Sequence, residues 1–239
     1  MRKNAVLIPT YNNPKTIKNV VFDVIDHGYE AIVVDDGSDI EVESLFDNDE
    51  KEHVHFVKHD RNRGKGAAIF SGVIQAKELG YTYVGSIDGD GQHLASEMQK
   101  LLSSYKEGEI MIGARNFDLA HVPKGSKFGR WFSNFWACWD TGYTITDSLS
   151  GYRIYPVSIV NLDIKTSGFD WEMEVLVRHA DAGGSISEVP IECYYPTPDE
   201  RVSHFRKFDD TMAIVWVHVP SLWKKWTTAI FNTLLLRNR

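Results

Sequence analysis

The chain has 239 residues, of which 43% are hydrophobic and 25% are charged. This length and composition are typical of one large α/β domain, or of one domain with an appendage. The formal net charge of −7 excludes a general nucleic-acid-binding protein, which would carry an excess of Lys and Arg. The two cysteines, Cys138 and Cys193, are too few and too far apart for a disulfide scaffold or a zinc site, and they favour a reducing compartment.

The N-terminus has no pattern of a secretory leader, because the apolar run that begins at Ala5 stops at Pro9. No apolar stretch approaches the roughly 20 residues that a membrane-spanning helix needs. We therefore expect a cytoplasmic protein.

Strand and helix patterns alternate along the first 90 residues. Short apolar runs, typical of buried parallel strands, occur at residues 5–8, 31–34, 53–57 and 83–87. The apolar spacing over 17–25 and 67–79 predicts two helices, and each is followed by a glycine that ends it. This alternation predicts an α/β fold with a doubly wound, mostly parallel sheet.

The second half of the chain is less regular. We expect a helix over about 95–106, a strand at 110–112, a strand at 150–155, a helix from about 169 to 182 and an extended segment at 186–193. Five aromatic residues between them, Trp131, Phe132, Phe135, Trp136 and Trp139, have helical spacing. A helix that faces the core is slightly favoured over a platform that contacts a substrate.

The C-terminal part differs from the rest in charge. Residues 201–239 carry seven basic and two acidic groups, a net charge of +5, whereas residues 1–200 carry 19 basic and 31 acidic groups, a net charge of −12. Apolar pieces at 211–223 and 226–236 are each too short to span a bilayer. Their tryptophans and neighbouring lysines suit an interfacial membrane anchor or a dimer contact, and the alternative is a helical pair docked on the protein's own core. We therefore divide the chain into a domain at 1–210 and amphipathic C-terminal helices at 211–239.

Two carboxylates stand one residue apart in Asp88-Gly89-Asp90-Gly91-Gln92-His93, directly after the run at 83–87. Asp-Gly pairs are common in turns, so a simple turn is one interpretation. Carboxylate and amide oxygens are also the hard ligands that Mg²⁺ and Mn²⁺ prefer.

Polar loops follow four of the expected strands, at residues 9–13, 35–38, 88–93 and 113–115. A parallel sheet brings the carboxyl ends of its strands to one edge, where open α/β folds bind ligands. Other motifs fail in detail: no glycine-rich dinucleotide fingerprint follows the first strand, and Gly64-Lys65-Gly66 lacks the rest of a Walker loop. His93 stands where a calcium-binding loop needs glycine. The four loops together predict a ligand site.

Six motifs resemble those of the inverting family-2 glycosyltransferases, especially the branch of dolichyl-phosphate mannose synthase and the bacterial polyprenyl-phosphate glycosyltransferases. They are Ile-Pro-Thr-Tyr-Asn-Asn (8–13), Val-Val-Asp-Asp-Gly-Ser (33–38), Gly-Lys-Gly-Ala-Ala (64–68), Asp-Gly-Asp-Gly-Gln-His (88–93), Gly-Ala-Arg (113–115) and Ser-Gly-Tyr-Arg (150–153). The resemblance covers roughly residues 4–207 and implies the nucleotide-diphospho-sugar transferase (GT-A) fold and a nucleotide-sugar donor.

The resemblance also implies roles for single residues on the donor side. The nucleoside pocket would be lined by Pro9, Tyr11 and Asn13, with Val34 and Asp36 at the base and ribose. Asp88, Gly89 and Asp90 match the Asp-x-Asp motif that binds Mn²⁺ or Mg²⁺, and Gln92 matches an additional metal ligand. Arg115 matches a contact to phosphate or sugar, and Arg201 and Lys207 match a basic pair that grips the diphosphate. The segment around that pair otherwise departs from the lipid-phosphate branch, which leaves the acceptor open.

The acceptor decides whether a base is needed. A lipid phosphate is already an anion, whereas a hydroxyl acceptor needs a general base. Asp170 and Glu172 are the candidates for that base, and their alternative role is to stabilise a helix N-terminus by its dipole. Arg130 and Asn134 are weaker candidates for holding an acceptor phosphate.

We therefore predict a metal-dependent, inverting glycosyltransferase with a lipid-linked acceptor, such as polyprenyl phosphate, that works peripherally at the inner face of the membrane. A hydroxyl acceptor on a glycan or glycolipid is the first alternative. A sugar nucleotidyltransferase and a non-catalytic nucleotide-sugar binder are the others. We expect no nucleic-acid partner, and a homo-oligomer is compatible with the C-terminal helices.

Overall fold

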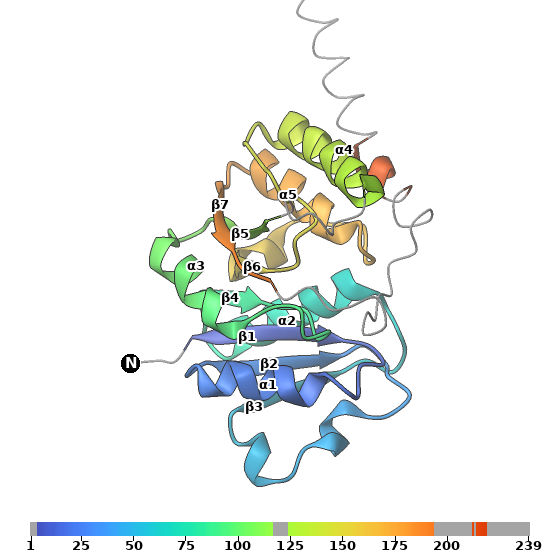
Figure 1. Ribbon diagram of the computed structural model, residues 1–239, viewed down its shortest axis with the longest axis vertical. Coiled ribbons are helices and arrows are strands. Elements are labelled where there is room, and N and C mark those ends of the chain that lie inside the picture. The colour runs from blue at the N-terminus through green and yellow to red at the C-terminus, as the bar shows by residue number, and fades with distance from the viewer. Residues whose placement is uncertain (1–3, 117–123, 194–211, 213, 219–239) are drawn as a thin grey trace, which may run out of the picture.

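The computed structural model describes residues 4–116, 124–193, 212 and 214–218 (Figure 1). Its centre is a seven-stranded sheet with the strand order β3-β2-β1-β4-β6-β5-β7. The strands are β1 (Ala5–Thr10), β2 (Glu30–Asp35), β3 (Val54–Lys58), β4 (Tyr83–Ser86), β5 (Ile110–Arg115), β6 (Arg153–Pro156) and β7 (Ile186–Ile191). Among the seven strands of the described residues, only β6 runs antiparallel to its neighbours, β4 and β5, and the other strand pairs are parallel. The prediction of a mostly parallel α/β sheet is confirmed.

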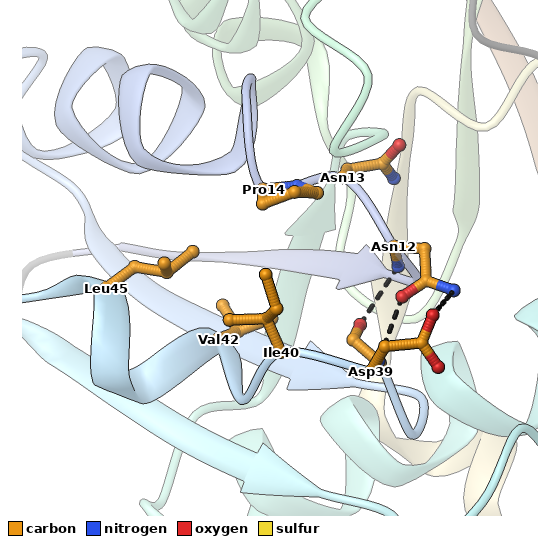
Figure 2. Close-up of a pocket in the computed structure, with 8 residues that line it drawn as sticks. Asn12, Asn13, Pro14, Asp39, Ile40, Val42 and Leu45 are labelled. Carbon is orange, nitrogen blue, oxygen red and sulfur yellow. Dashed lines mark hydrogen bonds between the residues drawn. The ribbon is translucent and has the colours of Figure 1, made fainter.

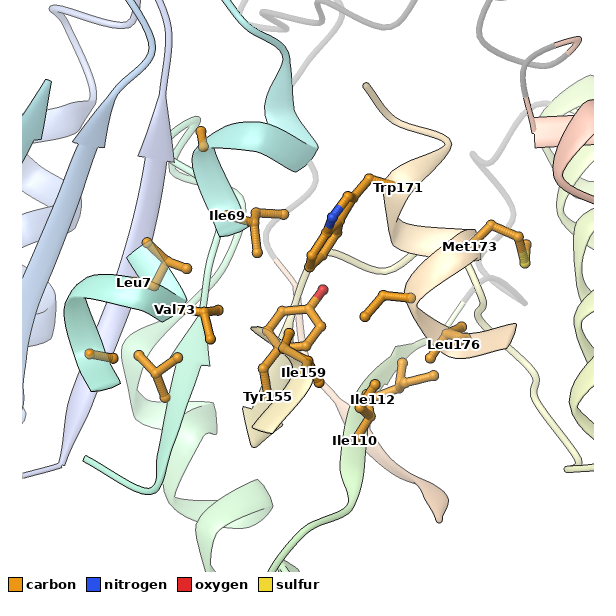
Figure 3. Packing of buried hydrophobic residues seen from close by; sticks show 14 of the residues in the cluster. Leu7, Ile69, Val73, Ile110, Ile112, Tyr155, Ile159, Trp171, Met173 and Leu176 are labelled. Carbon is orange, nitrogen blue, oxygen red and sulfur yellow. The ribbon is translucent and has the colours of Figure 1, made fainter. Parts of the chain in front are cut away.

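Helices cover both faces of the sheet. They are α1 (Ile17–Asp26), α2 (Lys65–Glu78), α3 (Met98–Ser104), α4 (Lys124–Thr141) and α5 (Trp171–Asp181). One hydrophobic cluster lies under α2 and α5, and the other lies under α1 and α3. Figure 3 shows the first cluster, in which Ile69 and Val73 of α2 approach Leu7 of β1. Trp171, at the start of α5, lies at the upper end of the cluster in this view.

The continuous apolar runs of the strands follow from this double cover. In β1, Leu7 enters the cluster under α2 and α5, whereas its neighbours Val6 and Ile8 enter the other cluster. All three side chains are at most 1% exposed. Successive side chains of a strand point to opposite faces, so a sheet that is buried on both faces requires apolar residues at every position.

Two expected elements differ from the structure. The strand expected at 150–155 is β6, which begins only at Arg153 because residues 148–151 form a loop at the sheet edge. The helix expected over 95–106 is a 3₁₀ turn, Ala95–Glu97, followed by α3, which ends at Ser104. Tyr105 after it has an extended backbone.

The helix expected from the aromatic spacing is α4, but the expectation that it faces the core is wrong for three of its aromatic residues. Trp131, Phe135 and Trp139 are 61%, 48% and 53% exposed. Their rings form a ladder along α4, with centroids 6.2 and 6.3 Å apart. Ala137 on the opposite side of the helix is completely buried. The side of α4 that packs on the core therefore carries the small residue Ala137, whereas the rings of Trp131, Phe135 and Trp139 face outward.

A short C-terminal stretch, residues 212 and 214–218, is helical and packs on α4. The Nδ1 atom of His218 contacts a carboxylate oxygen of Asp140, and its ring stacks on Trp136. Ile214 is 3% exposed, whereas Trp216 is 65% exposed. The boundary at 210 and most of the tail at 211–239 lie outside the described residues. Within the described ranges, no helix has both the length and the apolar character needed to cross a bilayer.

Candidate active site

The polar loops that follow β1, β2, β4 and β5 meet at one edge of the sheet, as expected from the parallel pairing. The hydroxyl of Thr16, in the first loop, donates to the carbonyl of Gly89, with a donor–acceptor distance of 2.7 Å. The backbone N–H of Asn12 donates to Ser38 Oγ at 2.9 Å. On the other side, Ser150 Oγ donates to the carbonyl of Gly113 at 2.7 Å. Direct hydrogen bonds thus join segments that are far apart in the sequence.

Asp90 and Gln92 form a closed pair in the loop after β4. The backbone N–H of Gln92 donates to Asp90 Oδ1 at 3.0 Å, and its side-chain amide donates to Asp90 Oδ2 at 2.7 Å. Because the amide nitrogen of Gln92 points to Asp90, its carbonyl oxygen is left for another ligand. Burial and the charge of Asp88 raise the pKa of Asp90 to about 6. The loop therefore holds more negative charge than its surroundings balance.

Asp88 is fixed by its neighbours. Its Oδ1 atom lies 2.8 Å from the Nζ atom of Lys65. Burial is the largest single effect and would raise the pKa of Asp88, but the contacts with Lys65, together with the charges of His93 and Arg115, outweigh it and lower the pKa to about 2. The backbone N–H of Asp88 donates to His93 Nδ1 at 3.0 Å, so this ring nitrogen carries no proton. Burial lowers the pKa of His93 to about 4 and keeps the ring neutral.

The donor atoms of this loop fit a hard divalent cation. Asp88, Asp90 and Gln92 supply carboxylate and amide oxygens, which suit Mg²⁺ or Mn²⁺. Burial and, after it, the charge of Asp88 raise the pKa of Asp90, so a cation bound beside this carboxylate would stabilise its charged form. No group of three or more His, Cys, Asp or Glu side chains within the described residues is placed to hold a metal ion. A metal here would therefore need further oxygens, such as those of a diphosphate, to complete its coordination.

Lys65 also lies at the site, in the segment Gly64-Lys65-Gly66, although no role for it is predicted from the sequence. Its Nζ atom lies 2.8 Å from Asp88 Oδ1 and 3.1 Å from Glu172 Oε1. Burial opposes its charge, but the two carboxylates raise the pKa of Lys65 above its usual range. In the sequence, Lys65 is a single basic residue between two glycines before a predicted helix. That pattern does not indicate which carboxylates the lysine contacts.

Two residues expected to contact the base and ribose of the donor, Val34 and Asp36, are buried and contact other parts of the protein. The side chain of Val34 is completely buried in the hydrophobic cluster under α2 and α5. Asp36 is 3% exposed, and its carboxylate accepts the backbone N–H groups of Arg63 and Gly64, both at 2.9 Å. His59 Nδ1 lies 2.6 Å from the same carboxylate. Asp36 therefore fixes the loop before α2, and His59 is a residue that the sequence reasoning missed.

Pro9, Tyr11 and Asn13 lie at the end of β1 and in the loop that follows it. Pro9 is buried within β1, whereas Tyr11 and Asn13 are partly exposed. Next to them, Asn12 takes a left-handed conformation with φ 54° and exchanges hydrogen bonds with Asp39 (Figure 2). A pocket of about 270 Å³ opens beside this loop and is lined by Asn12, Asn13, Pro14, Ser38, Asp39, Ile40, Val42 and Leu45.

Arg115 is held by a partner that the sequence did not reveal. Its Nε and Nη2 atoms donate to the two carboxylate oxygens of Asp147, at 2.7 and 3.0 Å. Asp147 is completely buried. The adjacent Ser148 donates to the side-chain oxygen of Asn134 at 2.8 Å, and Arg130 approaches the carbonyl of Arg115. Asn134 and Arg130 thus join α4 to the edge of the site.

The two candidate bases at the start of α5 differ in their surroundings. Glu172 is 3% exposed and its carboxylate faces Lys65. Asp170 is partly exposed, its Oδ1 atom accepts the N–H of Gly168 at 3.1 Å, and burial raises its pKa. Asp170 therefore combines solvent access with a raised pKa, as a general base requires. Arg201 and Lys207 lie outside the described residues.

Known proteins that are similar to this chain identify its family. Residues 5–141 match the family model described as glycosyl transferase family 2. A UDP-N-acetylglucosamine--dolichyl-phosphate N-acetylglucosaminyltransferase of Methanococcus voltae is 30% identical over 213 residues, which cover 80% of this chain and 85% of that protein. An undecaprenyl-phosphate mannosyltransferase of Micrococcus luteus is 28% identical over 196 residues, covering 77% of this chain and 81% of the relative.

A crystal structure of glucosyl-3-phosphoglycerate synthase from Mycobacterium tuberculosis, in complex with Mn²⁺, UDP and glucosyl-3-phosphoglycerate, has the same fold. Its TM-score is 0.68 at 16% identity, over 92% of this chain and 80% of that one. The chain therefore belongs to glycosyl transferase family 2 and has the GT-A fold. It is a glycosyltransferase.

Proposed function

We propose that this member of glycosyl transferase family 2 transfers a sugar from a nucleotide-diphosphate sugar to a lipid-linked acceptor, a polyprenyl phosphate, with inversion at the anomeric carbon. The reaction would use Mn²⁺ or Mg²⁺ and take place at the cytoplasmic face of the membrane. The observation that carries the choice of acceptor is the exposed aromatic ladder of α4, on a helix joined to the site edge through Asn134.

The donor side rests on the loop after β4. Asp88, Asp90 and Gln92 would hold the metal, which as a Lewis acid would stabilise the negative charge that develops on the leaving diphosphate. Arg201 and Lys207 are proposed to contact the same diphosphate with charge-assisted hydrogen bonds. Tyr11 and Asn13, in the loop after β1, are proposed to face the nucleoside.

The surroundings of Glu172 favour an acceptor that is already ionised. Glu172 is buried against Lys65 and so is badly placed to take a proton from an incoming hydroxyl. A lipid phosphate needs no base, because its oxygen is an anion at neutral pH. The relatives from Methanococcus voltae and Micrococcus luteus, named for dolichyl-phosphate and undecaprenyl-phosphate, favour the same class of acceptor.

Contact with the membrane would come from α4 and the C-terminal segment together. Trp131, Phe135 and Trp139 of α4 and Trp216 of the segment expose large aromatic side chains. Tryptophan prefers the interface between the headgroups and the acyl chains of a bilayer. The net charge of +5 on residues 201–239 would favour an anionic lipid surface.

A hydroxyl acceptor on a glycan or glycolipid is the second candidate, and Asp170 is the observation that favours it. Its partial exposure and raised pKa suit a general base. The variant Asp170→Asn separates the two acceptors. Transfer to a phosphate should keep most of its rate, whereas transfer to a hydroxyl should fall by about a hundredfold or more.

The test is a donor screen with UDP-, GDP- and dTDP-sugars, each with Mn²⁺ or Mg²⁺, in the presence of total membrane lipid. We expect labelled sugar to appear in a lipid that mild acid hydrolyses, as a sugar phosphodiester of a polyprenol is acid-labile. Asp90→Asn should abolish this transfer. Transfer only to water-soluble glycans, or to a lipid hydroxyl through an acid-stable bond, would overturn the proposed acceptor.

A further inference from the structure

A buried cation connects the two sides of the site. Lys65 is at the first position of α2, and its Nζ atom contacts both Asp88 in the loop after β4 and Glu172 at the start of α5. The side chain of Lys65 is 18% exposed, that of Asp88 is 25% exposed and that of Glu172 is 4% exposed. Three segments that are far apart in the sequence thus meet at one ammonium group.

The surrounding backbone leaves this arrangement little room to move. The N–H of Gly66 donates to the carbonyl of Gly168 at 3.2 Å, which ties the start of α2 to the loop before α5. A Cβ atom on Gly66 would lie 2.1 Å from the Cβ of Trp171, so only glycine allows this approach. Arg153, completely buried, donates to the backbone carbonyl of Glu172 at 2.8 Å. Glu172 is therefore fixed through both its backbone and its carboxylate.

We propose that Glu172 is a positioning residue of the donor site, which balances the charge of Lys65 so that Asp88 stays available to the metal. This inference rests on the proposed metal-dependent function. Lys65 and a metal ion compete for the carboxylate of Asp88, since both are cations. The carboxylate of Glu172 also contacts Lys65 Nζ, so it balances part of the charge of Lys65 and weakens the attraction between Lys65 and Asp88.

This role differs from that of a general base in a way that can be measured. A base acts only when the acceptor is present and leaves the affinity for the metal unchanged. A residue that balances Lys65 changes the affinity for the metal without any acceptor. Glu172→Gln keeps the size of the side chain but removes its charge, so Lys65 would be balanced by Asp88 alone and would compete more strongly with the metal.

The experiment titrates Mn²⁺ into the full-length protein, in the presence of UDP and in a parallel series with GDP. Free Mn²⁺ is read by electron paramagnetic resonance. We expect the dissociation constant of Mn²⁺ to rise about tenfold in Glu172→Gln, as one charge removed at this range produces in a partly buried site. The double variant Lys65→Met/Glu172→Gln restores the net charge around Asp88 and should return the constant to within about threefold of the unchanged protein.

Glu174→Gln is the matched control. Glu174 lies two residues further along α5, is 5% exposed, and accepts the backbone N–H groups of Lys165 and Thr166 at 3.0 and 2.8 Å. No contact between Glu174 and Lys65 occurs among the described ion pairs. Its variant should lower the melting temperature but leave Mn²⁺ binding unchanged, which separates a general loss of stability from the specific effect.

The possible results divide clearly. Unchanged Mn²⁺ binding in Glu172→Gln, with loss of transfer to the acceptor, would overturn the inference and make Glu172 a base. Weakened binding that the double variant does not rescue would overturn the charge balance. If the unchanged protein bound no Mn²⁺ with either nucleotide, the proposed metal-dependent function itself would fail, and the inference with it.

Discussion

The titration of Asp90 reports directly on the charge of the site. Burial and the neighbouring Asp88 raise the pKa of Asp90 to about 6, whereas the pKa of Asp88 itself is lowered to about 2. Between about pH 2 and pH 6, therefore, this pair carries one proton, and that proton is on Asp90. A divalent ion would replace that proton, so metal binding and acid should compete.

This shift predicts how the stability of the metal-free protein depends on pH. The pKa of Asp90 is higher in the folded protein than in the unfolded chain, so its contribution to stability is present at low pH and is lost as the pH rises through about 6. Asp90→Asn resembles the protonated form. The stability advantage of Asp90→Asn over the unchanged protein should be clear at pH 7 and shrink toward pH 5, measured by urea unfolding without metal. An advantage that stays constant would contradict the raised pKa.

Gly151 predicts the effect of a single methyl group on the site. A Cβ atom at this position would lie 2.7 Å from Asp88 Oδ1 and 2.8 Å from Lys65 Nζ. Both atoms are the ends of site side chains and not backbone, so an added methyl group would displace the charged groups of the site and leave the backbone in place. Gly151→Ala should lower kcat/KM at least about tenfold, with a loss of stability below about 2 kcal/mol.

Gly129→Ala is the control for this substitution. Gly129 lies within α4, and no atom of the described residues stands within 4 Å of an added Cβ. Ala is favoured over Gly inside a helix by about 1 kcal/mol, so this variant should be as active as the unchanged protein and equally or more stable. Equal activity of Gly151→Ala and Gly129→Ala would show that the contact at Gly151 does not matter.

Among the elements, α2 determines how closely the site is assembled on the sheet. Its residue Gly72 faces β1, and a Cβ atom there would lie 2.0 Å from Cδ1 of Leu7. Because Leu7 is completely buried, it has no free space to move into. The approach of α2 to β1 brings Lys65, at the beginning of the helix, to the carboxyl edge of the sheet.

Gly72→Ala should therefore destabilise the protein through overpacking, by about 1–3 kcal/mol, although alanine is the better helix former. The measurement is equilibrium unfolding in urea. Lys77→Ala, on the exposed side of the same helix, should change the stability by less than about 0.5 kcal/mol. A stabilised Gly72→Ala would mean that α2 stands further from β1.

At the scale of the whole molecule, the acidic body and the exposed aromatic ladder predict how the protein meets a membrane. The rings of Trp131, Phe135 and Trp139 face outward from α4, and Trp216 is exposed on the segment that packs against it. If these rings bind the membrane interface and the basic groups of residues 201–239 bind the lipid headgroups, membrane binding should depend on both the aromatic residues and the lipid charge.

We expect the full-length protein to float with vesicles that contain about one third anionic lipid, and to float less as salt screens the charges. Replacing Trp131 and Trp139 together by Gln should reduce binding about tenfold or more, since about 1.4 kcal/mol of lost interaction is sufficient. Trp171→Phe, a change inside the core at a residue 2% exposed, is the control and should not alter flotation. Binding that is indifferent to both Trp substitutions would remove the aromatic ladder from the membrane contact.

The sequence alone determined the class of fold and the edge of the sheet that carries the site. Runs such as Val6-Leu7-Ile8 are apolar at every position only when both faces of a strand are buried, and parallel strands place their following loops at one edge. The sequence therefore places Asp88, Asp90 and Gln92 at this edge, because their loop directly follows a strand.

The tertiary structure decided which charges face one another and which side chains are exposed. Lys65 meets Glu172, and Arg115 meets Asp147, across distances in sequence that no local pattern encodes. Helical spacing of aromatic residues is the same whether they face the core or the solvent, so only the packing of α4 could place Trp131 outside. Local periodicity specifies elements, whereas ion pairs and exposed faces depend on how those elements dock.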